Sequence, residues 1–157
     1  MAIEKAREYL AKFGLDGDVM EFDVSSATVE LAAKALGVDG ARIAKTLSFM
    51  TDVPILIVTA GDAKIDNKKY KERFRTKAKM LSFDEVEALI GHAVGGVCPF
   101  GIKEGVKVFL DVSLKRFETV FPACGSSNSA IELTPERLFE ISKDAEWVDV
   151  CKLPATE

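Results

Sequence analysis

The feature that most constrains the fold is the run ILIVTA at residues 55–60, which is typical of a buried β-strand. A short turn, TDVP, joins it to a second strand pattern that begins near Lys45. Later in the chain, the strand patterns VKVFLDVSL, ETVFPAC and AIELT follow one another without an intervening helix. Parallel neighbours need a crossover, usually a helix, so this pattern argues against a purely parallel sheet. The sequence predicts an α+β fold with a mixed, curved, barrel-like sheet of about seven strands surrounded by helices.

Helical patterns separate the remaining strands. Apolar residues recur at helical spacing in residues 2–13, and TVELAAKALG reads as a capped helix that ends at Gly37. Ser82 and Glu85 form the capping-box pattern of a helix over FDEVEALI, and Thr134 precedes Pro135 at the start of a last helix. No linker or internal repeat divides the chain, so we expect one unit over residues 1–157.

Composition narrows the functional classes. The 157 residues are 48% apolar and 29% charged, as in soluble globular domains. The apolar runs are too short to cross a bilayer and the N-terminus lacks a secretory pattern, so we expect a cytoplasmic protein without a membrane partner. Three cysteines without a CxxC pair and a single histidine argue against disulfides and zinc. We therefore expect neither metal nor cofactor.

Positive charge is concentrated in one segment of this acidic chain. Residues 64–79 hold eight of the 21 basic residues against two acids, which gives +6 in a protein of net charge −4. Part of this segment, DNKKYKERFR, is expected to form a helix with Tyr70 and Phe74 facing inward. Such a patch either attracts a polyanion or is simply a solvated helix face, and charge alone favours the second interpretation.

A glycine-rich stretch, GHAVGGVCPFG at residues 91–101, has the composition of a shaped loop. Main-chain N–H groups of Gly95, Gly96 and Val97 are little obstructed by side chains, so they are candidate donors to a substrate carbonyl or oxyanion. The loop matches neither the Walker pattern nor the dinucleotide fingerprint. The alternative is a purely structural turn.

Other candidate functional residues lie near this loop or in similar surroundings. Lys45 stands among apolar neighbours at a strand start, where it either snorkels to water or opens into a cleft to hold a phosphate, a carboxylate or a carbonyl. Cys98 and His92 suggest a thiol hydrolase, but Pro99 follows the cysteine where an activating helix start would be expected. A second polar loop, GSSNS at residues 125–129, has side chains that could orient a small polar ligand.

Five segments together resemble the YbaK/prolyl-tRNA synthetase-associated editing-domain family over about residues 25–150. They are TVELAAKALGVDGARIAKTLSF, VTAGDAKIDNKKY, GHAVGGVCPFG, VFLDVSL and GSSNSAIELTPERL, in this order. The resemblance implies a free-standing hydrolase that cuts the ester of misacylated tRNA, chiefly tRNA(Pro) carrying Cys, Ala, Ser or Thr. Misacylated tRNA and prolyl-tRNA synthetase are the implied partners, and DNA is not expected.

The resemblance also implies roles for single residues. The family lysine maps onto Lys45, which would act in catalysis by contact with the substrate end of the tRNA, beside the substrate-binding residue Thr46. The Gly-x-x-x-Pro loop maps onto Gly95 to Pro99, so the aminoacyl pocket would include Gly95, Cys98 and Pro99, with catalytic N–H donors from Gly96 and Val97. The polar substrate-binding segment maps onto Gly125, Ser126, Ser127, Asn128 and Ser129. Some alanine-specific members have a histidine in that segment and this chain has none, which leaves alanine specificity open.

Under this interpretation His92 lines or supports the pocket and is not the base. The tRNA phosphates would meet Lys64, Lys68, Lys69 and Lys71, and an intrinsically labile ester would need only binding, a placed water and oxyanion stabilisation. Two alternatives stay open at this point. One is a tRNA-binding or nucleic-acid-binding module without catalysis, and the other is a small-molecule thioesterase that depends on Cys98.

Overall fold

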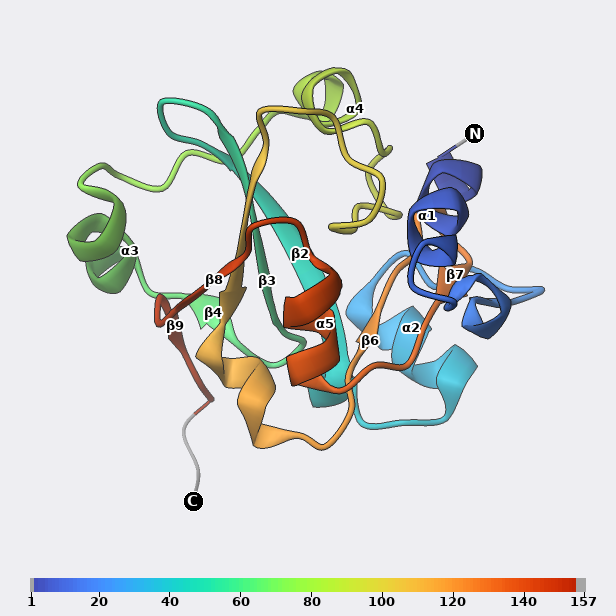
Figure 1. The fold of residues 1–157 in the computed structure, drawn as a ribbon. Helices are drawn as coiled ribbons and strands as arrows, with labels where there is room; N and C mark the ends of the chain where they lie inside the picture. The colour runs from blue at the N-terminus through green and yellow to red at the C-terminus, as the bar shows by residue number, and fades with distance from the viewer. Residues whose placement is uncertain (1, 155–157) are drawn as a thin grey trace.

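A mixed five-stranded sheet is the centre of the computed structural model, which describes residues 2–154 (Figure 1). The strand order is β6–β2–β3–β5–β8, and the strands are β2 Ile43–Met50, β3 Pro54–Ala60, β5 Lys107–Asp111, β6 Phe121–Pro122 and β8 Glu146–Val148. Strands β2 and β3 are antiparallel, whereas the other three neighbouring pairs are parallel. The predicted α+β fold with a mixed sheet is confirmed.

Four further strands form two small pairs beside this sheet. β1 (Met20–Glu21) pairs with β7 (Ser129–Ala130), and β4 (Lys64–Ile65) pairs with β9 (Cys151–Lys152). The expected sheet of about seven strands is therefore, within residues 2–154, a sheet of five with four two-residue strands outside it. The expected strand AKML is reduced to a single bridge between Phe49 and Met80.

Five α-helices are present in the described chain, close to the predicted positions. They are α1 Ala2–Ala11, α2 Val29–Leu36, α3 Asn67–Phe74, α4 Phe83–Ile90 and α5 Pro135–Ile141. Local chemistry accounts for their ends: the Thr28 side chain caps α2, Gly37 ends it in the left-handed region, and Ser82 and Glu85 form the expected capping box of α4. Within residues 2–154, no helix has the length and apolar character needed to cross a membrane.

The two faces of the sheet are covered by different helices. On one face, the rings of Phe49, Tyr70, Phe74 and Phe109 form a continuous series that packs α3 against β2 and β5. On the other face, Leu56 of β3 packs with Val86 and Ile90 of α4. Figure 1 shows α3 on one side of the sheet and α1 and α2 on the other. Neighbouring residues of β2 therefore face different surroundings, because side chains alternate along a strand.

Candidate functional site

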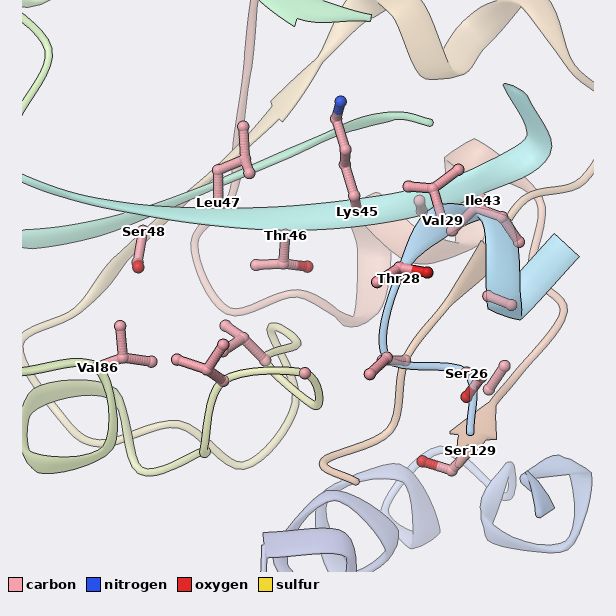
Figure 2. A pocket seen from close by; sticks show the side chains of 18 of the residues that line it. Ser26, Thr28, Val29, Ile43, Lys45, Thr46, Leu47, Ser48, Val86 and Ser129 are labelled. Atoms are coloured by element: carbon pink, nitrogen blue, oxygen red, sulfur yellow. The ribbon is translucent and has the colours of Figure 1, made fainter. Parts of the chain in front are cut away.

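A cavity of about 430 Å³ lies between β2 and the glycine-rich loop (Figure 2). Its lining residues come from the segment before α2, from β2, from the start of α4, from the glycine-rich loop, and from β6 and β7. Most of the lining is apolar, and the polar side chains are mainly hydroxyls, such as those of Thr46, Ser48 and Ser129. A small, mainly apolar space with a few hydroxyls suits a small organic group better than a large ionic one.

The floor of the cavity is a stretch of β2 whose outer edge is unpaired. On this edge, β6 pairs with Ile43 and Ala44, while residues 79–81 pair with the other end through Met50 N to Lys79 O at 2.8 Å and Leu81 N to Ser48 O at 3.1 Å. Between them, among the described residues, the main chain of Thr46 has no strand partner on this edge. An unpaired strand edge presents N–H and C=O groups that a ligand can bind.

Thr46 also directs its side chain toward this space. Figure 2 shows it on the side of β2 that faces the cavity, as Ser48 is. Its hydroxyl oxygen is buried and has no hydrogen-bond partner among the described residues. Because a buried, unpaired polar atom is costly, native proteins satisfy almost all of them, and the exceptions often mark functional positions.

The glycine-rich loop forms the opposite wall, and glycine is required at two of its positions. Gly95 has a φ of 99°, in the left-handed region. A side chain on Gly96 would lie 2.6 Å from the main-chain nitrogen of Ser126, so the two loops touch through their backbones. The prediction that this stretch is a shaped loop holds, and its shape depends on the second polar loop.

The predicted pair of N–H donors needs a correction. The Gly96 N–H donates to Ala93 O at 3.1 Å, which closes a turn inside the loop, and Gly96 does not line the cavity. Gly96 is therefore a packing residue and not an oxyanion donor. Val97 does line the cavity, and among the described residues no acceptor is found for its N–H.

The second polar loop, residues 125–129, mostly supports the segments that form the cavity wall and contributes little to the lining itself. Ser126 Oγ donates to Ser129 Oγ at 2.7 Å, and Asn128 Nδ2 donates to Phe22 O at 2.9 Å. Ser127 O accepts the Ser26 N–H, so this loop holds the segment that leads into α2. Of the five residues predicted here, Ser129 reaches the cavity lining, whereas Gly125, Ser126, Ser127 and Asn128 do not.

Lys45 is placed differently from the expectation. It is among the lining residues, yet Figure 2 shows its side chain on the face of β2 opposite Thr46, pointing away from the cavity. Its ammonium group donates to Ala63 O at 2.6 Å and lies 3.5 Å from Gly61 O. Burial lowers the pKa of Lys45. Strand alternation explains the placement, because adjacent residues cannot share a face.

His92 and Cys98 meet, as the thiol-hydrolase alternative requires, but both side chains are fully buried. The Phe100 carbonyl lies 2.7 Å from His92 Nε2, which must carry the proton because a carbonyl only accepts. Cys98 Sγ lies 3.5 Å from the same nitrogen, which is therefore not a base toward the thiol. Burial raises the pKa of Cys98 to about 12. Together with Pro99, these residues stabilise the loop and do not line the cavity.

The basic helix α3 covers the sheet face opposite the cavity. Lys68 and Lys71 are exposed and border a shallow surface hollow with Glu72 and Arg75. Lys69 is already engaged, since its ammonium group contacts Asp149 at 3.1 Å and Cys151 O at 3.0 Å. Lys64 is exposed on β4. The four lysines predicted to contact phosphates therefore differ: three are exposed, whereas Lys69 is already bonded within the protein.

Several cavity residues were missed in the sequence. They include Ser26, Val29, Phe83, Val86, Phe121 and Ala123. Three of them had a readable signal, because Val29 and Val86 lie on the apolar faces of predicted helices and Phe121 lies in a strand pattern. Periodicity does not predict which of the apolar faces leave a cavity between them.

Comparison with known proteins identifies the class of protein. The chain belongs to the aminoacyl-tRNA editing domain family, whose family model matches residues 24–141. It is 57% identical over 154 residues to YwhH of Bacillus subtilis, an uncharacterized protein. The alignment covers 97% of this chain and 98% of YwhH.

More distant relatives carry functional names. EbsC of Enterococcus faecalis, named provisionally as a Cys-tRNA(Pro)/Cys-tRNA(Cys) deacylase, is 29% identical over 73% of this chain and 72% of its own. The proline–tRNA ligase of Shouchella clausii is 30% identical over 73% of this chain but only 21% of the ligase. A crystal structure described provisionally as a trans-editing enzyme for prolyl-tRNA synthetase superposes with a TM-score of 0.87 and 25% identity, covering 96% of this chain and 97% of that one.

Proposed function

We propose that this protein is a trans-editing aminoacyl-tRNA deacylase that hydrolyses the ester of misacylated tRNA, with tRNA(Pro) carrying Cys, Ser, Thr or Ala as the substrate. Membership of the editing-domain family supports the reaction class. The names of the EbsC and proline–tRNA ligase relatives support the choice of tRNA(Pro).

The observation that carries the proposal is Thr46 at the gap in the β2 edge. Its unpaired hydroxyl faces the Gly95–Val97 wall across a cavity of about 430 Å³. An aminoacyl group in this space would find a hydroxyl and an open strand edge on one side and the Val97 N–H on the other. Its side chain would meet apolar residues such as Val29, Val86 and Phe121. Discrimination between amino acids would depend on volume, at about 1–3 kcal/mol per methylene.

The proposed chemistry needs no nucleophile from the protein. A water oxygen attacks the ester carbonyl carbon, the bond from that carbon to the ribose oxygen breaks, and the ribose oxygen takes up the proton that the water loses. Charge that develops on the carbonyl oxygen is stabilised by the Val97 N–H. Orientation of an already labile ester in a water-poor space supplies the remaining rate enhancement. The full burial of Cys98 speaks against a thiol mechanism.

The acceptor stem would bind outside the cavity through charge. Arg75, at the C-terminal end of α3, is five residues from Met80 at the cavity, a span of at most about 18 Å. In this proposal, a stem whose 3′ end enters the cavity runs past Arg75 toward the exposed Lys68 and Lys71 of α3. Reversal of both charges should raise KM and weaken the salt dependence.

The test is a panel of mischarged tRNAs incubated with the protein at low salt. Release of Cys, Ser, Thr or Ala from tRNA(Pro), with Pro-tRNA(Pro) left intact, would support the proposal. Binding of tRNA without release of any amino acid would instead indicate a non-catalytic tRNA-binding module. Release that disappears in Cys98→Ala alone would indicate the thioesterase.

A further inference from the structure

Exposed apolar side chains gather at the mouth of the cavity. Six large hydrophobic residues are exposed in residues 2–154, and three of these line the cavity: Met80 at 58%, Phe83 at 74% and Val94 at 50% exposure. Phe83 is the most exposed of the six. A solvent-facing aromatic ring costs free energy, so a cluster of this kind at a cavity entrance marks a binding surface.

Phe83 is held on a rigid support. The chain just before it is tied to β2 by the Phe49–Met80 bridge and by Leu81 N to Ser48 O at 3.1 Å. The Ser82–Glu85 capping box then fixes Phe83 as the first residue of α4. The ring therefore extends from a backbone that is anchored on both sides, which reduces the entropy lost when a ligand packs on it.

The position of this ring relative to the cavity determines what it would meet. If the cavity holds an aminoacyl group, the ester joins that group to the terminal ribose, so the terminal base must lie close to the cavity mouth. Aromatic side chains stack on nucleobases without selecting among them, since every base has a π-face. Resting on the proposed function, we propose that Phe83, flanked by Met80 and Val94, is the stacking platform for the unpaired 3′-terminal base of the acylated RNA.

Local charge favours a nucleic acid over a protein partner on this surface. Arg75, Lys77 and Lys79 are exposed in the segment that leads to Met80. The acids of α4 are Asp84, Glu85 and Glu87, and the Glu85 carboxylate is already bound to the Ser82 N–H at 2.8 Å, which leaves Asp84 and Glu87 to oppose these three cations. An apolar platform that follows a run of cations matches a stacked base joined to a phosphate backbone.

The first experiment measures stacking without turnover. A minihelix RNA with 2-aminopurine at its 3′ end is titrated with wild-type protein, Phe83→Ala and Phe83→Tyr. We expect the wild type and Phe83→Tyr to quench the 2-aminopurine fluorescence. In the same titration, Phe83→Ala should bind the RNA about tenfold more weakly. The matched control is Leu153→Ala, which removes an exposed apolar side chain that is not among the cavity-lining residues. Equal titrations for wild type and Phe83→Ala, or no quenching by the wild type, would overturn the platform.

The second experiment separates this inference from the proposed function. Deacylation of a mischarged tRNA is compared with that of the same RNA lacking only its terminal base. Loss of the base should lower kcat/KM about tenfold for the wild type and have little further effect on Phe83→Ala. Equal losses in both proteins would refute the stacking role. If no mischarged RNA is hydrolysed while 2-aminopurine is still quenched, the deacylase proposal fails and the platform stands.

Discussion

Lys45 and Thr46 are consecutive residues of β2, yet their side chains leave the strand on opposite faces, and only that of Thr46 faces the cavity (Figure 2). The ammonium group of Lys45 instead holds the carbonyls of the turn that follows β3. One residue thus contributes to the site by contact with the cavity, and its neighbour by support of the strand. The two roles predict different consequences of substitution.

Thr46→Val should separate function from stability. The substitution keeps the shape of the side chain and removes a buried hydroxyl that has no partner. We expect the free energy of unfolding to stay the same or rise by about 1 kcal/mol, while kcat/KM for deacylation falls about tenfold. Thr59→Val is the control, because it removes a buried hydroxyl that is bonded to Ala60 O. Urea unfolding and a deacylation assay measure both effects, and unchanged activity in Thr46→Val would contradict the role.

Lys45→Met should lower stability and kcat together. It removes the hydrogen bonds from the ammonium group to Ala63 O and Gly61 O, at a cost of about 1–2 kcal/mol. Because this contact steadies the strand that carries Thr46, we expect kcat to fall with little change in KM. A raised KM with an unchanged melting temperature would instead mean that the ammonium group contacts the tRNA. Lys107→Met, at an exposed strand start, serves as the control.

Gly96→Ala should distort the wall of the cavity. The new Cβ would lie 2.6 Å from Ser126 N and 2.8 Å from Gly125 C, and both of these are backbone atoms that cannot rotate away. We expect a loss of about 1–3 kcal/mol in stability and a larger fractional loss of deacylation. At Gly17 an added Cβ has open space and φ is not positive, so Gly17→Ala should be neutral by thermal melting. Equal behaviour of the two variants would contradict the tight contact.

Cys98 should be unreactive in the folded protein. Burial raises its pKa to about 12, so almost no thiolate is present at pH 8. Iodoacetamide is expected to leave Cys98 unmodified in buffer and to alkylate it in concentrated urea, as peptide mass spectrometry would show. Cys98→Ala should retain deacylation. Rapid alkylation that abolishes activity would restore the thiol-hydrolase alternative.

Because His92 is buried, the folded protein should lose stability in weak acid. Burial lowers the pKa of His92 below its usual 6.5, so in moderately acidic solution the unfolded chain binds a proton that the folded chain does not. Stability is therefore complete above about pH 6.5 and falls as the pH decreases toward the folded pKa. Since this is the chain's one histidine, urea unfolding between pH 7.5 and 5 should show the slope, and His92→Gln should flatten it. A wild-type profile that is flat in this range would contradict the burial effect.

Much of the architecture was predictable because it depends on local signals. The Ser82–Glu85 box, Gly37 and the run ILIVTA each act over a few residues, and all three predicted their elements correctly. The short strands were harder, since a two-residue pair such as β4 with β9 depends on segments far apart in the chain. Their residues therefore carry little periodicity of their own.

The candidate site was only partly predictable for the same reason. Thr46, Val97 and Ser129 were expected near a ligand and do line the cavity. Side chains alternate along a strand, so the direction of Lys45 away from the cavity follows once the start of the strand is known. Strand boundaries, however, are the least certain part of a sequence-based prediction. The internal use of the Gly96 N–H depends on the turn geometry, which the residue types do not specify.

The unpaired stretch of β2 also bears on the tendency of the protein to aggregate in concentrated solution. Open strand edges are templates for addition of another chain, and aggregation often begins there. Here the open length is only about three residues, with β6 on one side and the 79–81 segment on the other. A foreign strand of typical length, about five or six residues, would collide with both neighbours. The gap is thus too short to accept an added strand of ordinary length.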